Sequence, residues 1–186
     1  MEPWQIILIV VGVLAVIVLC WWISTANNLK VMGVKIDEAL SGIDVALTKR
    51  YDLLTKAVAT VKGYAKHEEE TLSKIIAMRN PGSAATLMEK QDFAAQTTQA
   101  LKSINIVAEQ YPNLKADTQF VALQNNIRDI EEQLQAARRL YNANVSKYNQ
   151  SIIVFPASLV ANALHLTKRD FFEAEEVKRE DVKIEF

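Results

Sequence analysis

Residues 6–23 form an unbroken run of 18 residues that are all apolar or glycine. At a helical rise of about 1.5 Å per residue, such a run covers roughly 27 Å, which is close to the thickness of the hydrocarbon core of a bilayer. The sequence therefore predicts an N-terminal transmembrane helix. Its expected membrane-spanning side chains, spaced along the run, are Ile6, Val10, Leu14, Ile17, Cys20 and Ile23.

Tryptophans flank this run on both sides. Trp4 precedes it, and Trp21 and Trp22 lie near its end. Indole favours the interfacial layers of a membrane, because the ring is apolar while its N–H group prefers water. The alternatives are a cleaved signal peptide and a buried core helix. A signal peptide normally begins with basic residues, and the first three residues contain none, so a retained anchor over residues 1–27 is favoured.

The orientation of the anchor follows from the charges beside it. Cytoplasmic segments next to a transmembrane helix are enriched in Lys and Arg. The N-terminal flank contains neither, whereas Lys30 and Lys35 follow the run. We therefore expect a single-pass protein of the cell inner membrane, with its N-terminus outside and the remaining chain in the cytoplasm.

Composition favours a helical body and excludes several classes of function. Of the 186 residues, 50% are hydrophobic, and only 5 are Gly and 4 are Pro. These are too few turn-forming residues for a sandwich of short strands. The 21 Lys and Arg nearly balance the 22 Asp and Glu, so no net field would hold nucleic acid. One Cys and two His leave little for a disulfide or a metal site. We expect no cofactor and no nucleic-acid partner.

Beyond the anchor, apolar residues return at steps of three and four, which predicts long amphipathic helices. One seam runs from Leu29 to Tyr64 and is interrupted by Arg50, and the longest stripe runs from Phe120 to Phe155. Arg50 is expected to pair with a carboxylate or to reach the edge of the seam. Helices are predicted near residues 28–63, 68–79, 84–109 and 117–154.

These helices predict an all-α fold. In the favoured arrangement, the transmembrane helix is followed by an antiparallel up-and-down four-helix bundle with long helices of coiled-coil type, over residues 28–166. A three-helix version, in which the first two helices of the bundle fuse, is the alternative.

Local signals mark where the helices should end. A break is expected between Gly63 and Glu68, and Asn80-Pro81-Gly82-Ser83 supplies the chemistry of a turn. Asp117 or Thr118 is the expected N-cap of the last long helix. Tyr141 and Tyr148 stand seven residues apart on one face of that helix, where they could form a recognition stripe. The favoured interpretation is that they are half-buried, with hydroxyls that reach water or a carbonyl.

No constellation of catalytic residues is found in the sequence. His67-Glu68-Glu69-Glu70 is better interpreted as a solvated helix start than as a metal site, because the other histidine, His165, is almost 100 residues away. Cys20 lies in the anchor and cannot act with His67. The glycines are scattered singly, so no phosphate-binding loop is present. We therefore expect no enzymatic activity.

The segment 151–164 is apolar on nearly all sides and carries no charge. It is too short to span a bilayer and contains a proline, so it must be covered by the base of the bundle, by the membrane surface or by a neighbouring copy. In a four-helix path this segment returns to the membrane side, and in a three-helix path it does not. The candidate membrane-face or self-association patch consists of Ile152, Ile153, Phe155, Pro156, Leu159, Val160 and Leu164.

The last part of the chain, residues 167–186, is rich in charge. It is interpreted as a flexible, solubilising tail, although Phe171 and Phe172 could still pack. A peptide that binds a partner is the alternative.

Three groups of residues resemble the LemA family of bacterial membrane proteins. They are Arg50-Tyr51-Asp52-Leu53-Leu54 running into Val61-Lys62-Gly63-Tyr64-Ala65-Lys66-His67-Glu68, then Tyr111-Pro112-Asn113-Leu114-Lys115-Ala116, and then Tyr141-Asn142 and Tyr148-Asn149 followed by Phe155-Pro156. The resemblance implies an N-terminal membrane anchor with the amino end outside, a compact helical bundle and no assigned enzymatic activity. Relatives include proteins associated with magnetosome formation.

Two classes of function fit these observations. The first is a membrane-anchored scaffold or adaptor that forms a homo-oligomer or organises membrane-associated proteins that the sequence does not identify. The second is a regulatory subunit, in which the single span transmits a signal to the bundle. The scaffold is favoured, because only about five residues precede the span and leave almost no room for an external sensor. The lipid bilayer is the one partner that the sequence itself indicates.

Overall fold

A computed structural model describes residues 2–65 and 69–173, and within them all regular structure is helical. The predicted all-α class is confirmed. The six helices are α1 (Pro3–Tyr64), α2 (Glu69–Ile76), α3 (Leu87–Gln110), α4 (Pro112–Lys115), α5 (Thr118–Ile153) and α6 (Ala157–Ala163). Four of them correspond to the predicted helices, with α1 also containing the apolar run, whereas α4 and α6 were not predicted as separate helices.

The chain divides into two compact units, and both α1 and α5 contribute to each of them. We call residues 1–38 and 141–171 the anchor unit, and the remaining residues, from 39–140 and from 172 onward, the body unit. Of the predicted charged tail, residues 174–186 lie outside the described part of the chain, as do His67 and Glu68 of the acidic helix start.

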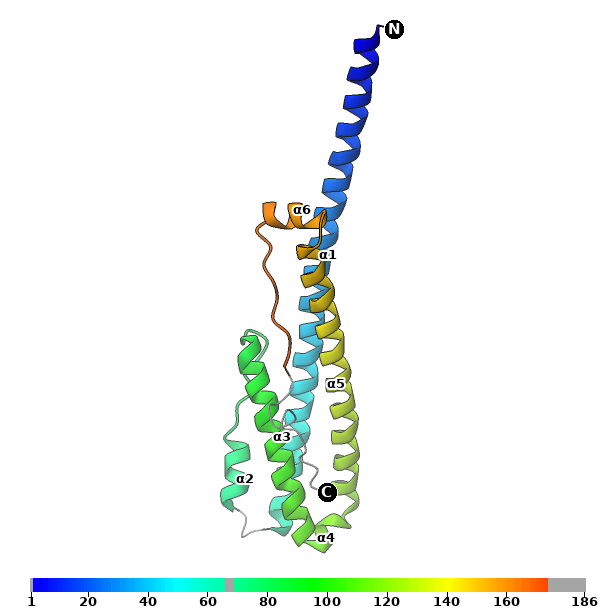
Figure 1. Ribbon diagram of the computed structural model, residues 1–186. Coiled ribbons are helices and arrows are strands. Elements are labelled where there is room, and N and C mark those ends of the chain that lie inside the picture. The colour runs from blue at the N-terminus through cyan, green and yellow to red at the C-terminus, as the bar shows by residue number, and fades with distance from the viewer. Residues whose placement is uncertain (1, 66–68, 174–186) are drawn as a thin grey trace, which may run out of the picture. The chain divides into compact units, whose positions relative to one another are not determined.

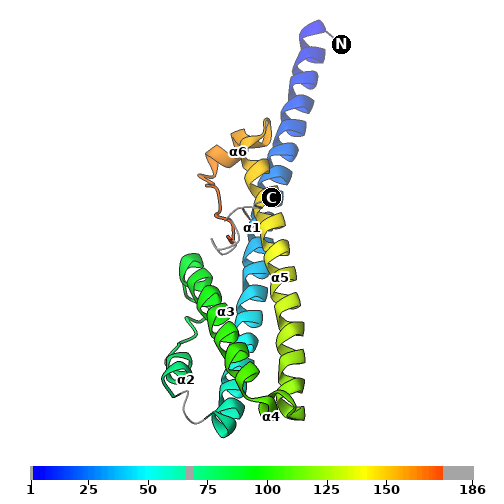
Figure 2. The same ribbon diagram turned by 60° about the horizontal axis from the view of Figure 1, so that its bottom comes forward.

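In the anchor unit, α5 and α6 accompany only the later part of α1. Figures 1 and 2 show the end of α5 antiparallel to α1, and α6 beside α1 where this pairing ends. Leu29 and Ile36 of α1 are buried, as are Val145 and Tyr148 of α5. The heptad seam therefore packs as its spacing predicts.

In the body unit, an apolar core joins α1, α2, α3, α4 and the start of α5. Its largest members include Leu54, Leu72, Ile104, Leu114 and Phe120. The seam prediction fails at its last residue, because Tyr64 is 42% exposed and its hydroxyl donates to the Asp117 carboxylate at 2.8 Å. A tyrosine at a helix end satisfies its hydroxyl more easily at the surface than inside a core.

The ends of α3 and α5 follow side-chain capping rules. Thr86 and Glu89 form a reciprocal capping box, so α3 begins at Leu87 and not at the predicted Ala84. The amides of Gln119 and Phe120 donate to Asp117 Oδ1 at 2.8 and 2.9 Å, which identifies Asp117 as the cap of α5. In the predicted turn, Gly82 has a φ of +79°, a conformation that glycine adopts without strain.

The cap at Asp117 predicts a dependence of stability on pH. The Phe120 amide, followed by the Tyr64 hydroxyl, lowers the pKa of Asp117 from its ordinary value of 3.8. A depressed acidic pKa stabilises the folded state above the ordinary value, and that contribution is lost as the pH falls through the lower folded value. We therefore expect Asp117→Asn to lower the melting temperature at neutral pH and the difference from the wild type to shrink as the pH falls below the ordinary value of 3.8. Thermal unfolding followed by circular dichroism measures this difference, and a difference that is constant with pH would contradict it.

Candidate functional site

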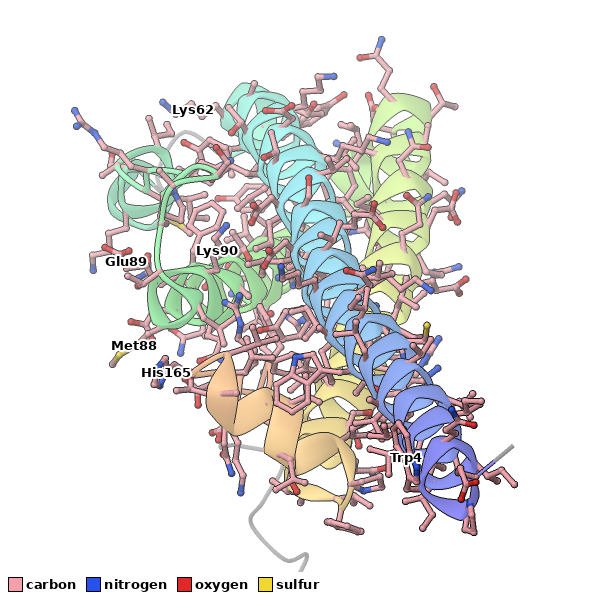
Figure 3. All side chains as sticks on the ribbon, turned by 90° about the horizontal axis from the view of Figure 1, so that it is seen from above. Trp4, Lys62, Met88, Glu89, Lys90 and His165 are labelled. Carbon is pink, nitrogen blue, oxygen red and sulfur yellow. The ribbon has the colours of Figure 1, made fainter. Side chains whose placement is uncertain are left out.

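The N-terminal part of α1 is apolar and uncovered. Among the described helices, α1 is the one that is long and apolar enough to cross a membrane. All the predicted membrane-spanning side chains are exposed, with Ile6 and Val10 at 50%, Leu14 at 55%, Ile17 at 57% and Ile23 at 51%, and Cys20 also lies on the surface. Figure 3 shows Trp4 on this end of the helix. An uncovered apolar surface of this length suits a lipid environment and is unsuited to water.

The exposure of side chains along α1 begins to fall at Trp21 and Trp22. Trp21 and Trp22 are partly buried, and their rings meet edge to face with centroids 6.5 Å apart. Leu29 is the first fully buried residue of the helix. The change from an exposed apolar surface to a packed surface thus takes place over about two turns of helix, between Trp21 and Leu29.

The structure divides the predicted apolar patch into an inner and an outer face. Ile152 and Val160 are buried, and Leu164 is partly buried. In contrast, Ile153 is 58% exposed, Phe155 75% and Leu159 53%, and Pro156 is also exposed. The corner between α5 and α6, which contains the cis peptide Phe155–Pro156, therefore buries one apolar face and presents the other.

A hydrogen bond sets the register of α5 against α1. Asn144 Nδ2 donates to the carbonyl of Lys35 at 3.0 Å. Because the two segments are antiparallel and each rises about 1.5 Å per residue, the end of α5 at Ile153 lies at about the level of Ala26. The exposed corner is therefore at about the level of the end of the apolar run at Ile23.

The chain after α6 lies along α5 in extended form. Asn149 holds the backbone of Arg169 twice, donating to its carbonyl at 2.8 Å and accepting from its amide at 2.9 Å. The Tyr141 hydroxyl donates to the carbonyl of Asp170 at 3.0 Å. Burial raises the pKa of Tyr141, and the neighbouring Arg169 partly opposes this rise. Tyr141 and Tyr148 are both 4% exposed, so these side chains pack and do not form an exposed recognition stripe.

The body unit contains a buried arginine at the interruption of the seam. Arg50 is 2% exposed and forms an ion pair with Glu131 of α5. Its guanidinium also donates to the Ala94 carbonyl at 2.9 Å and to the Thr97 and Thr98 hydroxyls at 2.7 and 2.8 Å. The first of the two predictions for Arg50, pairing with a carboxylate, is confirmed. A planar guanidinium can bind several acceptors at once, so Arg50 joins α1 to both α3 and α5.

A second buried cation, Lys90, was not predicted from the sequence. Lys90 is 1% exposed, and its ammonium donates to both carboxylate oxygens of Asp44 at 2.7 and 2.6 Å and to the Ser83 carbonyl at 3.0 Å. Figure 3 shows Glu89 and Lys90 on different sides of α3. Glu89 takes part in the cap of the helix, and Lys90 is buried. The carboxylate of Asp44 is 19% exposed.

This difference in exposure predicts an asymmetric effect of mutation. Asp44→Ala leaves the Lys90 ammonium buried without its carboxylate, and we expect the free energy of unfolding to fall by about 3 kcal/mol. Lys90→Met replaces the cation by an apolar chain of similar length and leaves a carboxylate that water can reach, so we expect a loss of about 1 kcal/mol. Denaturant unfolding of both variants measures the two losses. An equal or larger loss for Lys90→Met would contradict this account of the pair.

An open groove of about 310 Å³ lies between α3 and α5 in the body unit. Apolar and polar side chains of α3 and α5 line it, together with Arg50 and Ala57 of α1. Its lining includes Arg50, Leu101, Leu123, Ile127, Arg128 and Glu131. The part of the chain that the structure describes contains no group of three or more His, Cys, Asp or Glu that could hold a metal ion.

Two comparisons with known proteins agree with each other. A model of the LemA family matches residues 39–186. Protein LemA of Metamycoplasma hominis is 30% identical over 163 residues, which cover 87% of this chain and 74% of that relative. The matched residues 39–186 include Arg50, Asp117, Tyr141, Tyr148 and the α5–α6 corner. The chain belongs to the LemA family.

Proposed function

We propose that this LemA-family protein is a non-enzymatic scaffold or adaptor, held in the cell inner membrane by α1 with its N-terminus outside. Its helical body would then face the cytoplasm and present its surfaces to further copies of itself or to membrane-associated partner proteins. The observation that carries the proposal is the uncovered apolar stretch of α1 ahead of a body made of helices.

The chemistry of the body unit supports a binding role. Its two buried cations, Arg50 and Lys90, form ion pairs with Glu131 and Asp44 that join one helix to another. A catalytic site needs polar groups that converge on a space where a substrate fits. The groove between α3 and α5 instead offers a mixture of apolar and polar side chains along two helices, a surface that suits an amphipathic helix.

The mass of the purified protein tests the scaffold proposal. We expect the full chain, extracted in mild detergent, to elute as an assembly of several copies when its mass is measured by light scattering with correction for bound detergent. Chemical cross-linking in the native membrane before extraction controls for dissociation by the detergent. A monomer in both measurements, together with no cross-linked partner protein, would contradict the proposal.

A second function, signal transmission, is favoured by one observation. The helix α1 is unbroken from Pro3 to Tyr64, so one element contains both the apolar run and Arg50. Insertion of two glycines after Ala26 would interrupt this helix. A scaffold should keep the number of copies in its assembly after the insertion. In a signal-transmitting subunit, a change in the state of the anchor alters the hydrogen-exchange rates of the body, and the insertion should abolish this response. Both quantities can be measured on the same reconstituted sample.

A further inference from the structure

The exposed side of the α5–α6 corner is apolar and lies next to the exposed apolar stretch of α1 in the anchor unit. Its most exposed side chains are Ile153 and Val154, each at 58%, Phe155 at 75% and Leu159 at 53%. The register fixed by Asn144 and Lys35 places this corner at about the level where the apolar run of α1 ends. The apolar surface of the corner therefore continues the apolar surface of α1.

Over most of its length the anchor unit contains basic but no acidic side chains, although the charges of the whole chain nearly balance. Between residues 3–36 and 141–169 there is no Asp or Glu, whereas five basic residues occur there: Lys30, Lys35, Lys147, Lys168 and Arg169. The nearest acidic side chains after the span are Asp37, Glu38 and Asp170. Arg169 approaches Asp37 at 3.9 Å.

Three of these lysines lie at a similar level along the unit. Lys30, Lys147 and Lys168 are exposed. Asn144 lies opposite Lys35, which places Lys147 of the antiparallel α5 close to the level of Lys30. Asn149 binds the backbone of Arg169, which brings Lys168 to the same part of α5. The three lysines therefore lie within about two helical turns of one another along α1. That level is about 10 Å beyond Ile23, a distance that lysine side chains can span toward lipid headgroups.

We propose that the α5–α6 corner docks on an anionic lipid surface. Ile153, Val154, Phe155 and Leu159 insert into the interfacial layer of the leaflet from which α1 emerges, and Lys30, Lys147 and Lys168 contact the lipid phosphates. Apolar insertion combined with basic residues is the usual pattern for proteins that lie on such a surface. This second contact rests on the proposed anchoring by α1, and it fixes the rotation of the anchor unit about α1.

Lipid-borne quenchers test the docking in the full chain. In a Cys20→Ala background, a single cysteine at Val154 or Phe155 is labelled with an environment-sensitive fluorophore, and the protein is reconstituted in vesicles of phosphatidylcholine and phosphatidylglycerol. A doxyl-labelled lipid should quench both labels severalfold more than a label at Val34. Val34 is the matched control, because it is a valine of the same unit with a similar exposure, 56%, and lies about 16 Å beyond Ile23 along α1.

The contribution of charge has its own test. Removing a lysine near an anionic surface should shift the ratio of docked to undocked corner by about fivefold, since each such charge is worth about 1 kcal/mol. Lys168→Gln should therefore reduce quenching at Phe155 in vesicles that contain phosphatidylglycerol, and Lys102→Gln in the body unit is the control. Equal quenching at Phe155 with and without phosphatidylglycerol would overturn the assignment of an anionic surface.

Intrinsic fluorescence separates failure of docking from failure of anchoring. All three tryptophans lie within residues 4–22, so brominated lipids that quench their emission report on α1 alone. Quenched tryptophans with unquenched labels at Val154 and Phe155 would overturn the docking and leave the anchor in place. Disulfide formation between two copies through a cysteine at Phe155, with no quenching by lipid, would overturn it in favour of a contact between copies. Unquenched tryptophans would overturn the anchor and the docking together.

Discussion

Replacing Arg50 with Met should lower the free energy of unfolding by about 3 kcal/mol. The substitution leaves the Glu131 carboxylate without its cation and leaves the acceptors at Ala94 and Thr97 without their donor. The Glu131 carboxylate is 31% exposed and water can reach it, so most of the loss comes from the acceptors at Ala94 and Thr97, which are buried and lose their donor. Chemical unfolding of the full chain in detergent, followed by circular dichroism, measures the loss.

A second substitution tests whether the unpaired charge is the cause. Removing both partners in Arg50→Met with Glu131→Met should recover part of the lost stability, because the partly exposed Glu131 carboxylate then no longer lacks its cation. The exposed Arg139 of α5 provides the control, and Arg139→Met should change the free energy of unfolding by less than about 0.5 kcal/mol. Equal losses for Arg50→Met and Arg139→Met would show that the pair does not stabilise the body.

Two arginines placed in the apolar run should release the protein from membranes. On the insertion scale, each Leu, Ile or Val contributes about −0.3 to −0.6 kcal/mol, and an arginine near the centre of the helix costs about 2.5–3.5 kcal/mol. The double variant Val10→Arg with Leu14→Arg therefore costs about 5–7 kcal/mol, comparable to the favourable total of the whole run.

Flotation of vesicles in a density gradient measures this release. The wild type should float with the lipid, and the double variant should remain largely in the dense fraction. Val10→Leu with Leu14→Val, which keeps the run apolar, is the matched control and should float like the wild type. Flotation of the arginine variant with the lipid would contradict a span that includes Val10 and Leu14.

Periodicity predicted four of the six described helices, all but α4 and α6, and most of their buried faces. The seam residues Leu29, Ile36, Ile43, Leu47, Leu54, Ala57 and Val61 are all buried, because a heptad spacing keeps them on one side of a continuous helix. The stripe on α5 fails at Phe155, which is 75% exposed. The helix ends at Ile153, so Phe155 no longer shares the orientation of the residues before it.

The polar contacts between distant segments could not be predicted in this way. Lysine is almost always exposed, and nothing near Lys90 in the sequence indicates that Asp44 accepts from it. The binding of the Arg169 backbone by Asn149 depends in the same way on a return of the chain along α5. Spacing within one helix contains no information on which side chain of another helix lies opposite.

The candidate patch on residues 151–164 remains a prediction, and the structure adds which of its residues are exposed. The absence of charge from residues 151–164 identified a surface that needs a cover, but it could not distinguish the inner residues Ile152 and Val160 from the outer residues Ile153 and Phe155. That distinction depends on where α5 ends and α6 begins. The overall balance of charge likewise concealed the basic residues of the anchor unit, because folding brings two distant segments of the sequence together.

The central claim of this account is that α1 holds the protein in a bilayer, and the depth of its tryptophans tests it most directly. All three tryptophans flank or end the apolar run, so the full chain needs no added label. In vesicles of lipids brominated at different depths, we predict the strongest quenching by bromines close to the headgroup, because indole prefers the interfacial layers. Emission typical of indole in water, unchanged by bromines at every depth, would contradict the claim.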